Sequence, residues 1–140
     1  MHNGEPNIDS FVLKTIDDEL PILKEYVSVL FSRQKVLIGK ATLSTKSGVY
    51  AFYYEDTLMY IGEAKGNGGL KDRVLSKHVS GDDRHTLQKA FLKRFPDRTQ
   101  RREFIKQNIY VQWIEIECKE SVVLVERLLI WSLRPKWNLK

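Results

Sequence analysis

The sequence predicts a small α/β (α+β) domain in which a mainly antiparallel, three-stranded sheet is flanked by helices. Two short aromatic-rich runs, at 48–54 and 58–62, are separated by Glu55-Asp56-Thr57, a pattern typical of a β-hairpin. A third run, at 109–117, begins with the apolar and polar alternation of a strand. Apolar residues spaced three and four apart before and after these runs indicate amphipathic helices. The resulting order, helix, hairpin, helices, strand, helix, predicts the mixed class.

The first predicted element is a helix over residues 15–31. It follows a polar segment that we expect to be a frayed tail, and its apolar positions are Ile16, Leu20, Leu23, Val27, Leu30 and Phe31. Thr15 can cap its start, and Pro21 falls early enough to be tolerated. Residues 35–41 then predict a short strand or an extended connector, and residues 42–47 predict a loop.

The remaining helices follow the hairpin. Residues 70–79, 86–95 and 99–107 predict three short helices, with Pro96 between the last two. Residues 121–133 are strongly apolar and predict a final helix that ends before Pro135.

The composition limits the class of protein. With 140 residues, 42% of them hydrophobic and 29% charged, the chain can build its own core and is not disordered throughout. We expect a helical extension at 1–45 and a main domain at 46–140. Cys118 is the only cysteine, which excludes an internal disulfide framework or a zinc site made of cysteines. The chain shows neither a signal peptide nor a membrane-length apolar stretch, so we expect a cytoplasmic protein without membrane contact.

Positive charge is concentrated in the middle of the chain. The net charge is +5, and residues 64–108 carry twelve basic side chains against five acidic ones. Such a cluster is typical of a surface that meets a polyanion, although a solvated helical face would look the same.

Glu126 stands among apolar neighbours in the predicted last helix. Val122, Leu129, Ile130 and Leu133 lie on its side of that helix, so we expect part of the carboxylate to be covered. A buried carboxylate without a partner is costly. A structural salt bridge and a role as metal ligand or acid–base group fit the sequence equally well.

Tyr50 and Tyr60 lie on the two strands of the predicted hairpin, in the triplets Gly48-Val49-Tyr50 and Tyr60-Ile61-Gly62. Taken alone, such tyrosines are usually packing residues. A two-residue turn would place them on opposite faces of the sheet. A shared site therefore predicts an odd-length loop or a bulge in this hairpin.

Residues 62–69 form a glycine-rich break between a strand and a helix. Loop amides before a helix can hold phosphate, which makes a nucleotide-binding regulatory domain one alternative. The segment lacks a closing Gly-Lys-Ser/Thr and a Gly-x-Gly-x-x-Gly pattern, which argues against it. The predicted helix that follows carries a cationic cluster of Arg73, Lys77 and His78.

The two triplets, ten residues apart, resemble the signature of the GIY-YIG nuclease superfamily. The resemblance extends over residues 46–140, because Arg73 on the next helix, Glu126 in a late apolar helix and Asn138 near the end follow in the family's order. It implies a GIY-YIG-like fold and an endonuclease that hydrolyses phosphodiester bonds with divalent metal. The helix predicted over residues 15–31 lies outside the resemblance and is expected as an extra N-terminal helix.

The resemblance also implies roles for these residues. One Mg²⁺ (or Mn²⁺) ion would be held by Glu126 and would polarise the phosphate, while Arg73 would neutralise charge on the phosphoryl oxygens. Tyr50 would be the general base or orient the attacking water, with Tyr60 assisting. A tyrosine has an ordinary pKa near 10, so a base role needs the metal and Arg73 to lower it. Asn138 would hold substrate or buttress the site.

One departure from the family pattern concerns the histidine. The family often places it four residues after the arginine, where this chain has Lys77, whereas His78 stands five residues after Arg73. On an α-helix that shift rotates the side chain by about 100°. Either His78 reaches the site through a local distortion, or Lys77 takes the role, or neither does. We place His78 first.

DNA affinity is expected to come mainly from phosphate contacts, because no separate DNA-reading domain is seen. The residues proposed for these contacts are Lys65, Lys77, Arg94, Arg98, Arg101 and Arg102. We therefore expect a structure-directed or weakly sequence-specific DNA endonuclease of repair, recombination or restriction. A protein partner or a homodimer would supply specificity. The alternative is a non-catalytic nucleic-acid-binding module on the same fold.

Overall fold

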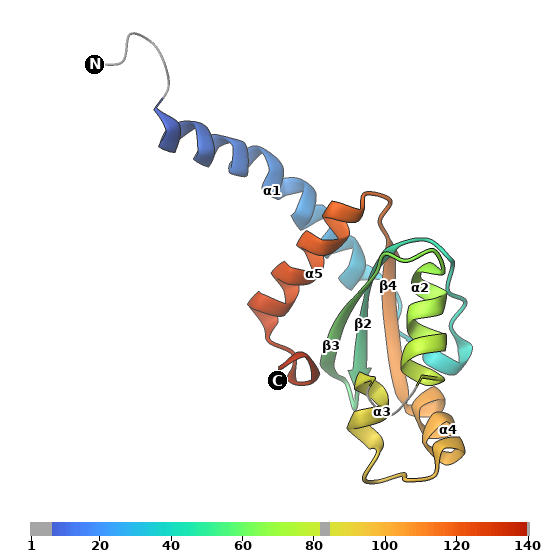
Figure 1. Cartoon of the computed structure of the whole chain (residues 1–140). Helices are drawn as coiled ribbons and strands as arrows, with labels where there is room; N and C mark the ends of the chain where they lie inside the picture. The colour runs from blue at the N-terminus through green and yellow to red at the C-terminus, as the bar shows by residue number, and fades with distance from the viewer. Residues whose placement is uncertain (1–6, 82–84, 140) are drawn as a thin grey trace.

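The computed structural model of the chain describes residues 7–81 and 85–139 and shows an antiparallel sheet with helices on both faces (Figure 1). The strands are β1 (Val36–Leu37), β2 (Gly48–Tyr54), β3 (Thr57–Ala64) and β4 (Ile109–Glu115). They pair in the order β1-β4-β2-β3, which leaves β3 at one edge. The predicted α+β class is confirmed, but the expected three strands are four. The short segment at 35–41 supplies the additional strand, because Val36 pairs with Val111.

The hairpin between β2 and β3 contains the predicted bulge. Its turn is the pair Glu55-Asp56, with φ of 50° and 63°, as a two-residue type I′ turn requires. The register then shifts between Phe52 and Tyr53. Beyond this bulge Phe52 lies opposite Tyr60, so Tyr50 and Tyr60 share one face of the sheet.

The N-terminal helix begins earlier than predicted. Helix α1 spans Ile8–Ser32, and the side chain of Asn7 caps it by accepting a hydrogen bond from the Ser10 amide. Thr15, the expected cap, instead donates its hydroxyl proton to the carbonyl of Phe11. The expectation that the first dozen residues form a frayed tail is therefore wrong for residues 8–12, and residues 1–6 lie outside the described part of the chain.

The other predicted helices are present. They are α2 (Gly69–Lys71), which continues into the π-helix η2 (Asp72–Val79), then α3 (Thr86–Phe91), α4 (Arg98–Asn108) and α5 (Lys119–Leu133). Two 3₁₀ turns, η1 (Ile38–Lys40) and η3 (Lys136–Asn138), complete the described residues. No helix within 7–81 and 85–139 is long and apolar enough to cross a membrane.

The sheet separates two apolar layers, because alternate residues of a strand point to opposite faces. On one face Tyr50 and Phe52 pack against the helices of the middle of the chain, among them Leu70 of α2. On the other face Val49 packs with Leu30 of α1 and with α5. The N-terminal part of α1 extends away from this body (Figure 1).

Candidate active site

A buried hydrogen bond joins Tyr50 of β2 to His78 of η2. The Tyr50 hydroxyl lies 2.8 Å from Nε2 of His78, and both side chains are almost completely buried. The ring of Phe52 contacts the His78 ring edge-on, with centroids 5.0 Å apart. This aromatic packing holds the pair in one orientation at the inner end of the site.

The π-helical winding of η2 brings His78 to Tyr50. A π-helix bonds residues five apart instead of four, as the amide of Ser80 does with the carbonyl of Leu75. Residues five apart therefore lie closer to the same face than on an α-helix. His78, five residues after Arg73 on η2, is thus turned toward the sheet and buried. Lys77 points to solvent. Of the two candidates, the structure brings His78 into the cluster and leaves Lys77 outside it.

Burial fixes the protonation of this pair. Desolvation, aided by the nearby Arg73 and His85, lowers the pKa of His78 to about 3. Desolvation, followed by the charge of Tyr60, raises the pKa of Tyr50 far above its ordinary value, although Arg73 opposes the shift. A phenolate base would need the opposite shift. Tyr50 therefore keeps its proton next to a neutral imidazole.

Tyr60 lies beside the pair and Arg73 faces the cluster from η2. The ring centroids of Tyr60 and His78 are 5.3 Å apart, and burial raises the pKa of Tyr60. Burial alone would lower the pKa of Arg73, but Tyr50, Tyr60 and Glu63 raise it. Arg73 is thus a solvent-accessible cation that faces two phenol hydroxyls and a carboxylate.

Glu126 of α5 approaches the same edge of the sheet and meets Glu63 of β3. Burial, followed by the charge of Glu63, raises the pKa of Glu126, while Arg127, Lys65 and Arg73 oppose the shift. The Glu126 side chain is only 14% exposed, and Arg127 lies 3.6 Å from it. The expectation that this carboxylate is covered is confirmed.

Glu63 is a site residue that the sequence reasoning missed. Its Oε1 lies 3.4 Å from the ammonium of Lys65. Its Oε2 is buried without a hydrogen-bond partner among the described residues. The sequence feature that could have identified Glu63 is its position directly after the triplet Tyr60-Ile61-Gly62.

The two carboxylates are oxygen donors of the kind that a magnesium-like ion takes. No group of three or more His, Cys, Asp or Glu that could hold a metal occurs among the residues the structure describes. Mg²⁺ commonly takes only one or two carboxylates and keeps several waters. A cation between Glu63 and Glu126 would satisfy the unpaired Oε2 and relieve the repulsion that raises the pKa of Glu126.

Asn138 of η3 binds the backbone of the edge strand. Its Oδ1 accepts a hydrogen bond from the amide of Ile61 at 2.8 Å, and its Nδ2 donates one to the carbonyl of Ile61 at 2.9 Å. The side chain therefore acts as a partner for β3 between Tyr60 and Gly62. Of the two expected roles, the contacts favour the buttress.

Arg101 does not belong to the proposed DNA-binding surface. Its side chain is buried, and Nε donates a hydrogen bond to Gln88 at 2.6 Å while Nη1 donates to the carbonyl of Phe95 at 2.8 Å. Arg101 instead ties α4 to α3, so the expectation that it contacts phosphate is wrong.

The other residues proposed for DNA contacts lie nearer the surface. Lys65, Lys77, Arg94 and Arg98 are exposed, and Arg102 is half-buried. Arg94 donates a hydrogen bond to the Tyr54 hydroxyl at 3.0 Å and lies over the ring of Phe104. Arg102 donates to the carbonyl of Ser80.

The glycine-rich segment is not arranged as a phosphate loop. The amides of Leu70 and Lys71 donate to the carbonyls of Lys46 and Ser44, at 2.9 and 2.8 Å. Gly69 adopts a φ of +61° where the chain meets Thr45 and Lys46. These amides are bonded within the chain, which removes the basis for the nucleotide-binding alternative.

Comparison with known proteins shows that this chain is similar to part of UvrABC system protein C. No protein-family model matches this chain. It is 31% identical over 105 residues to UvrABC system protein C of Helicobacter hepaticus and 27% identical over 111 residues to that of Helicobacter pylori. Each match covers 74% of this chain but 16% of the relative. The chain is thus similar to part of UvrABC system protein C and spans only a small fraction of that protein's length.

Proposed function

We propose that this chain is a GIY-YIG-type DNA endonuclease that hydrolyses phosphodiester bonds with a divalent metal ion. Five side chains from four elements meet at one edge of the sheet. They are Tyr50, Tyr60, Arg73, His78 and Glu126. This convergence is the observation that carries the proposal. Protein packing alone does not require an accessible arginine beside two protonated phenols and two crowded carboxylates.

The cation would be held by Glu126 together with Glu63. When bound, one Mg²⁺ or Mn²⁺ ion supplies Lewis-acid polarisation of the phosphate. The two carboxylates contribute negative charge at a position where Oε2 of Glu63 has no other partner. Lys65 and Arg73 lie close enough to lower the pKa of Glu126 and so limit its protonation when the cation is absent.

Tyr50 orients the attacking water in this proposal and does not remove its proton. Its pKa is raised by burial, and the neutral His78 holds its hydroxyl. Tyr60 assists as a second protonated hydroxyl on the same face of the sheet. Of the two roles expected for Tyr50, general base and orientation of the attacking water, the proposal keeps the second.

Arg73 neutralises charge that develops on the phosphoryl oxygens. A guanidinium is permanently charged and offers paired donors that match phosphate geometry. Asn138 keeps Tyr60 in register by binding the adjacent Ile61 backbone. Each of these side chains thus has a distinct task around one phosphate.

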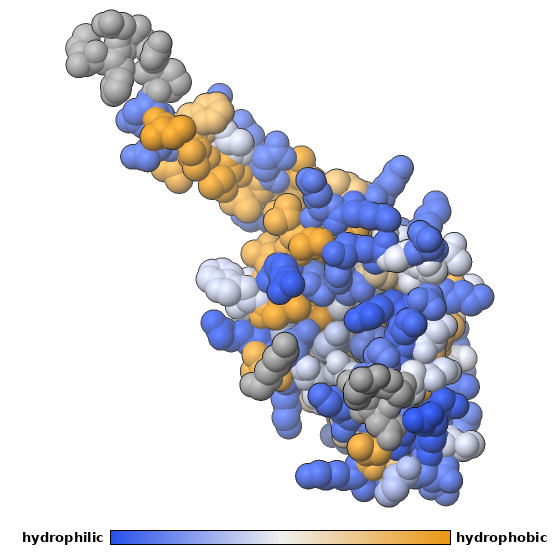
Figure 2. All heavy atoms as spheres, in the orientation of Figure 1, coloured by the Kyte–Doolittle hydropathy of each residue, from blue (hydrophilic) through white to orange (hydrophobic). Residues whose placement is uncertain are grey.

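DNA binding and partners follow from the surface. The phosphates would be contacted by Lys65, Lys77, Arg94, Arg98 and Arg102. Because phosphate contacts carry no sequence information, the cleavage would be structure-directed or weakly sequence-specific, in DNA repair, recombination or restriction. The relatives are named as one component of a UvrABC system, which supports a protein partner, and a homodimer is the alternative. Figure 2 shows apolar atoms along the extended part of α1, where Ile8 and Phe11 are exposed.

The decisive experiment is nicking of supercoiled plasmid and cleavage of branched DNA with Mg²⁺ or Mn²⁺. The comparison includes EDTA, the variant Glu126→Gln, and the matched control Glu120→Gln, which changes an exposed glutamate in the first turn of the same helix. Metal-dependent cleavage that is lost only in Glu126→Gln supports the proposal. Binding of every DNA without cleavage supports the non-catalytic module instead, and cleavage that survives Glu126→Gln contradicts the assigned metal ligand.

A further inference from the structure

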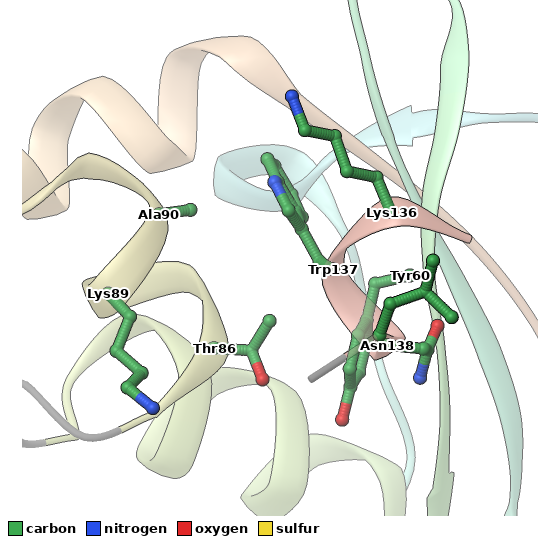
Figure 3. A pocket seen from close by; sticks show the side chains of 8 residues that line it. Tyr60, Thr86, Lys89, Ala90, Lys136, Trp137 and Asn138 are labelled. Carbon is green, nitrogen blue, oxygen red and sulfur yellow. The ribbon is translucent and has the colours of Figure 1, made fainter. Parts of the chain in front are cut away.

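A groove beside the candidate active site is lined mostly by residues to which the catalytic proposal gives no task. It has a volume of about 650 Å³ and is formed by α3 and η3, with Tyr60 and Asn138 at its boundary with the active site. The other polar and aromatic lining residues are Thr86, Lys89, Lys136 and Trp137. Figure 3 shows Thr86 and Trp137 facing the space between α3 and η3, with Lys89 and Lys136 on opposite sides of it.

The lining of this groove favours an anion. Within residues 7–81 and 85–139, no Asp or Glu lines it. Lys89 and Lys136 are exposed and form no ion pair with another described residue. Burial raises the pKa of Tyr60, although a hydrogen bond with Thr86 opposes the shift. The Tyr60 hydroxyl therefore stays protonated, and the hydrogen-bonded pair of hydroxyls can still donate to a ligand. Cations and hydroxyl donors without a carboxylate are suited to phosphate.

Trp137 gives the groove a fixed aromatic wall. Its ring stacks on Tyr54 with centroids 6.4 Å apart and meets Phe91 edge-on at 5.7 Å. The side chain is half-buried, so part of the indole faces the groove. An aromatic face combined with cations is the usual platform for single-stranded nucleic acid, because every base can stack on it.

The lysines lie at the two ends of the groove. In Figure 3 the Lys89 ammonium lies toward the end at which the Thr86 and Tyr60 hydroxyls point, and the Lys136 ammonium points to the opposite end. Tyr60 also contacts Tyr50 and His78 in the active site. A strand that leaves the active site past Tyr60 would therefore meet Lys89 first and Lys136 later.

We propose that this groove binds the single-stranded DNA segment next to the scissile phosphate, with its phosphates at Lys89 and Lys136 and a base against Trp137. The proposal rests on the proposed nuclease function and adds an unpaired flank to the substrate. Its ligand is a phosphodiester strand that can present a free base face, which a fully paired duplex cannot do.

The test measures binding in EDTA, so that it does not depend on cleavage. Fluorescence anisotropy compares a short labelled single strand with its duplex for the wild type and for the double variant Lys89→Gln/Lys136→Gln. The control Lys24→Gln/Lys119→Gln removes the same charge from two exposed lysines on α1 and α5. The groove variant is expected to bind the single strand about tenfold more weakly. The slope of the logarithm of the binding constant against the logarithm of salt concentration should also fall by about 1.4, because each single-strand phosphate contact contributes about 0.7.

A second measurement locates the strand. In NMR titrations the indole N–H signal of Trp137 should shift, whereas that of Trp131, which is 72% exposed on α5, should not. The chain has three tryptophans, so Trp113→Phe and Trp131→Phe together assign the signals. An equal loss of binding in both double variants, or an unshifted Trp137 signal, overturns the proposal that the groove binds single-stranded DNA, even if the protein cleaves plasmid. Tighter binding of the duplex that depends on the same lysines also overturns it. Groove binding without any cleavage supports the groove and contradicts the nuclease proposal.

Discussion

Tyr50 lies directly opposite Gly62 across the β2–β3 pair, and its ring occupies the space that a side chain at position 62 would need. A Cβ built on Gly62 would overlap the phenol ring of Tyr50. The glycine of the second triplet thus makes room for the tyrosine of the first. The two triplets are one structural unit, in which the bulge supplies the register and the glycine supplies the space.

Replacing this glycine should damage both stability and activity. Gly62→Ala should cost about 1–3 kcal/mol of unfolding free energy, because added bulk in a packed site forces its neighbours to move, and it should displace the Tyr50 hydroxyl from His78. Chemical unfolding and plasmid nicking measure the two effects. Gly66→Ala is the matched control, because a Cβ there meets nothing within 4 Å. Equal stability of the two variants would contradict this relationship.

His78 should make stability depend on pH below neutrality. Its pKa is lowered from 6.5 to about 3 in the folded chain, so between these values the unfolded chain binds a proton that the folded chain does not. The contribution is fully present above pH 6.5 and is lost as pH falls, by up to about 1.4 kcal/mol per pH unit. In His78→Gln the unfolding free energy should depend less steeply on pH between pH 4.5 and 6.5, by the equivalent of about one proton taken up on unfolding. Urea unfolding at several pH values measures this dependence. An unchanged slope would contradict a buried neutral histidine.

Glu126 should link stability to the metal ion independently of cleavage. Because burial and Glu63 raise its pKa, the ionised carboxylate opposes folding above its unfolded pKa, and Glu126→Gln should raise the melting temperature at pH 7 without metal. Adding Mg²⁺ should raise the melting temperature of the wild type by mass action but leave Glu126→Gln unchanged. Glu63→Gln should weaken the Mg²⁺ effect. If Mg²⁺ shifts all three proteins equally, the two glutamates do not hold it.

Arg73 and Lys77 should separate catalysis from binding. Arg73→Lys keeps the charge but loses the planar paired donors, and we expect kcat to fall by about 100-fold. Lys77→Gln should leave kcat nearly unchanged and reduce the salt slope of DNA binding by about one. Kinetics and binding titrations of both variants test this division. A large loss of kcat in Lys77→Gln would show that the exposed lysine, and not His78, serves the site.

Asn138 should act through the position of β3. Asn138→Ala leaves the amide and carbonyl of Ile61 without their side-chain partner, and we expect a loss of about 1–2 kcal/mol in unfolding free energy. Asn138→Asp keeps an acceptor but loses the Nδ2 donor, so it should rescue stability only in part. Full stability of the alanine variant with impaired DNA binding would instead make Asn138 a substrate ligand.

The sequence was sufficient for the elements and for the bulge. The helical and strand periods placed every main element, and the requirement that Tyr50 and Tyr60 share a face predicted an irregular hairpin. The two-residue strand β1 is too short for a periodic signal, which explains the error in strand number. Asn7 could have been recognised as a cap, but the polar residues around it concealed the start of α1.

The parts of the site that could not be predicted depend on tertiary contacts. The π winding of η2 has no simple sequence signal, yet it decides whether His78 or Lys77 faces Tyr50. Arg101 is buried because Gln88, thirteen residues earlier, accepts its hydrogen bond, and charge patterning alone cannot distinguish it from its exposed neighbours. Glu63 matters because α5 brings Glu126 beside it, which only the fold reveals.

The most direct measurement is the single-turnover nicking rate of supercoiled plasmid as a function of Mg²⁺ concentration, for the wild type and for Glu126→Gln. We expect a rate that saturates with Mg²⁺ in the wild type and falls by at least about 100-fold in the variant, while anisotropy shows unchanged DNA binding. Equal rates in the two proteins, or a wild-type rate that persists in EDTA, would contradict a metal-dependent nuclease centred on Glu126.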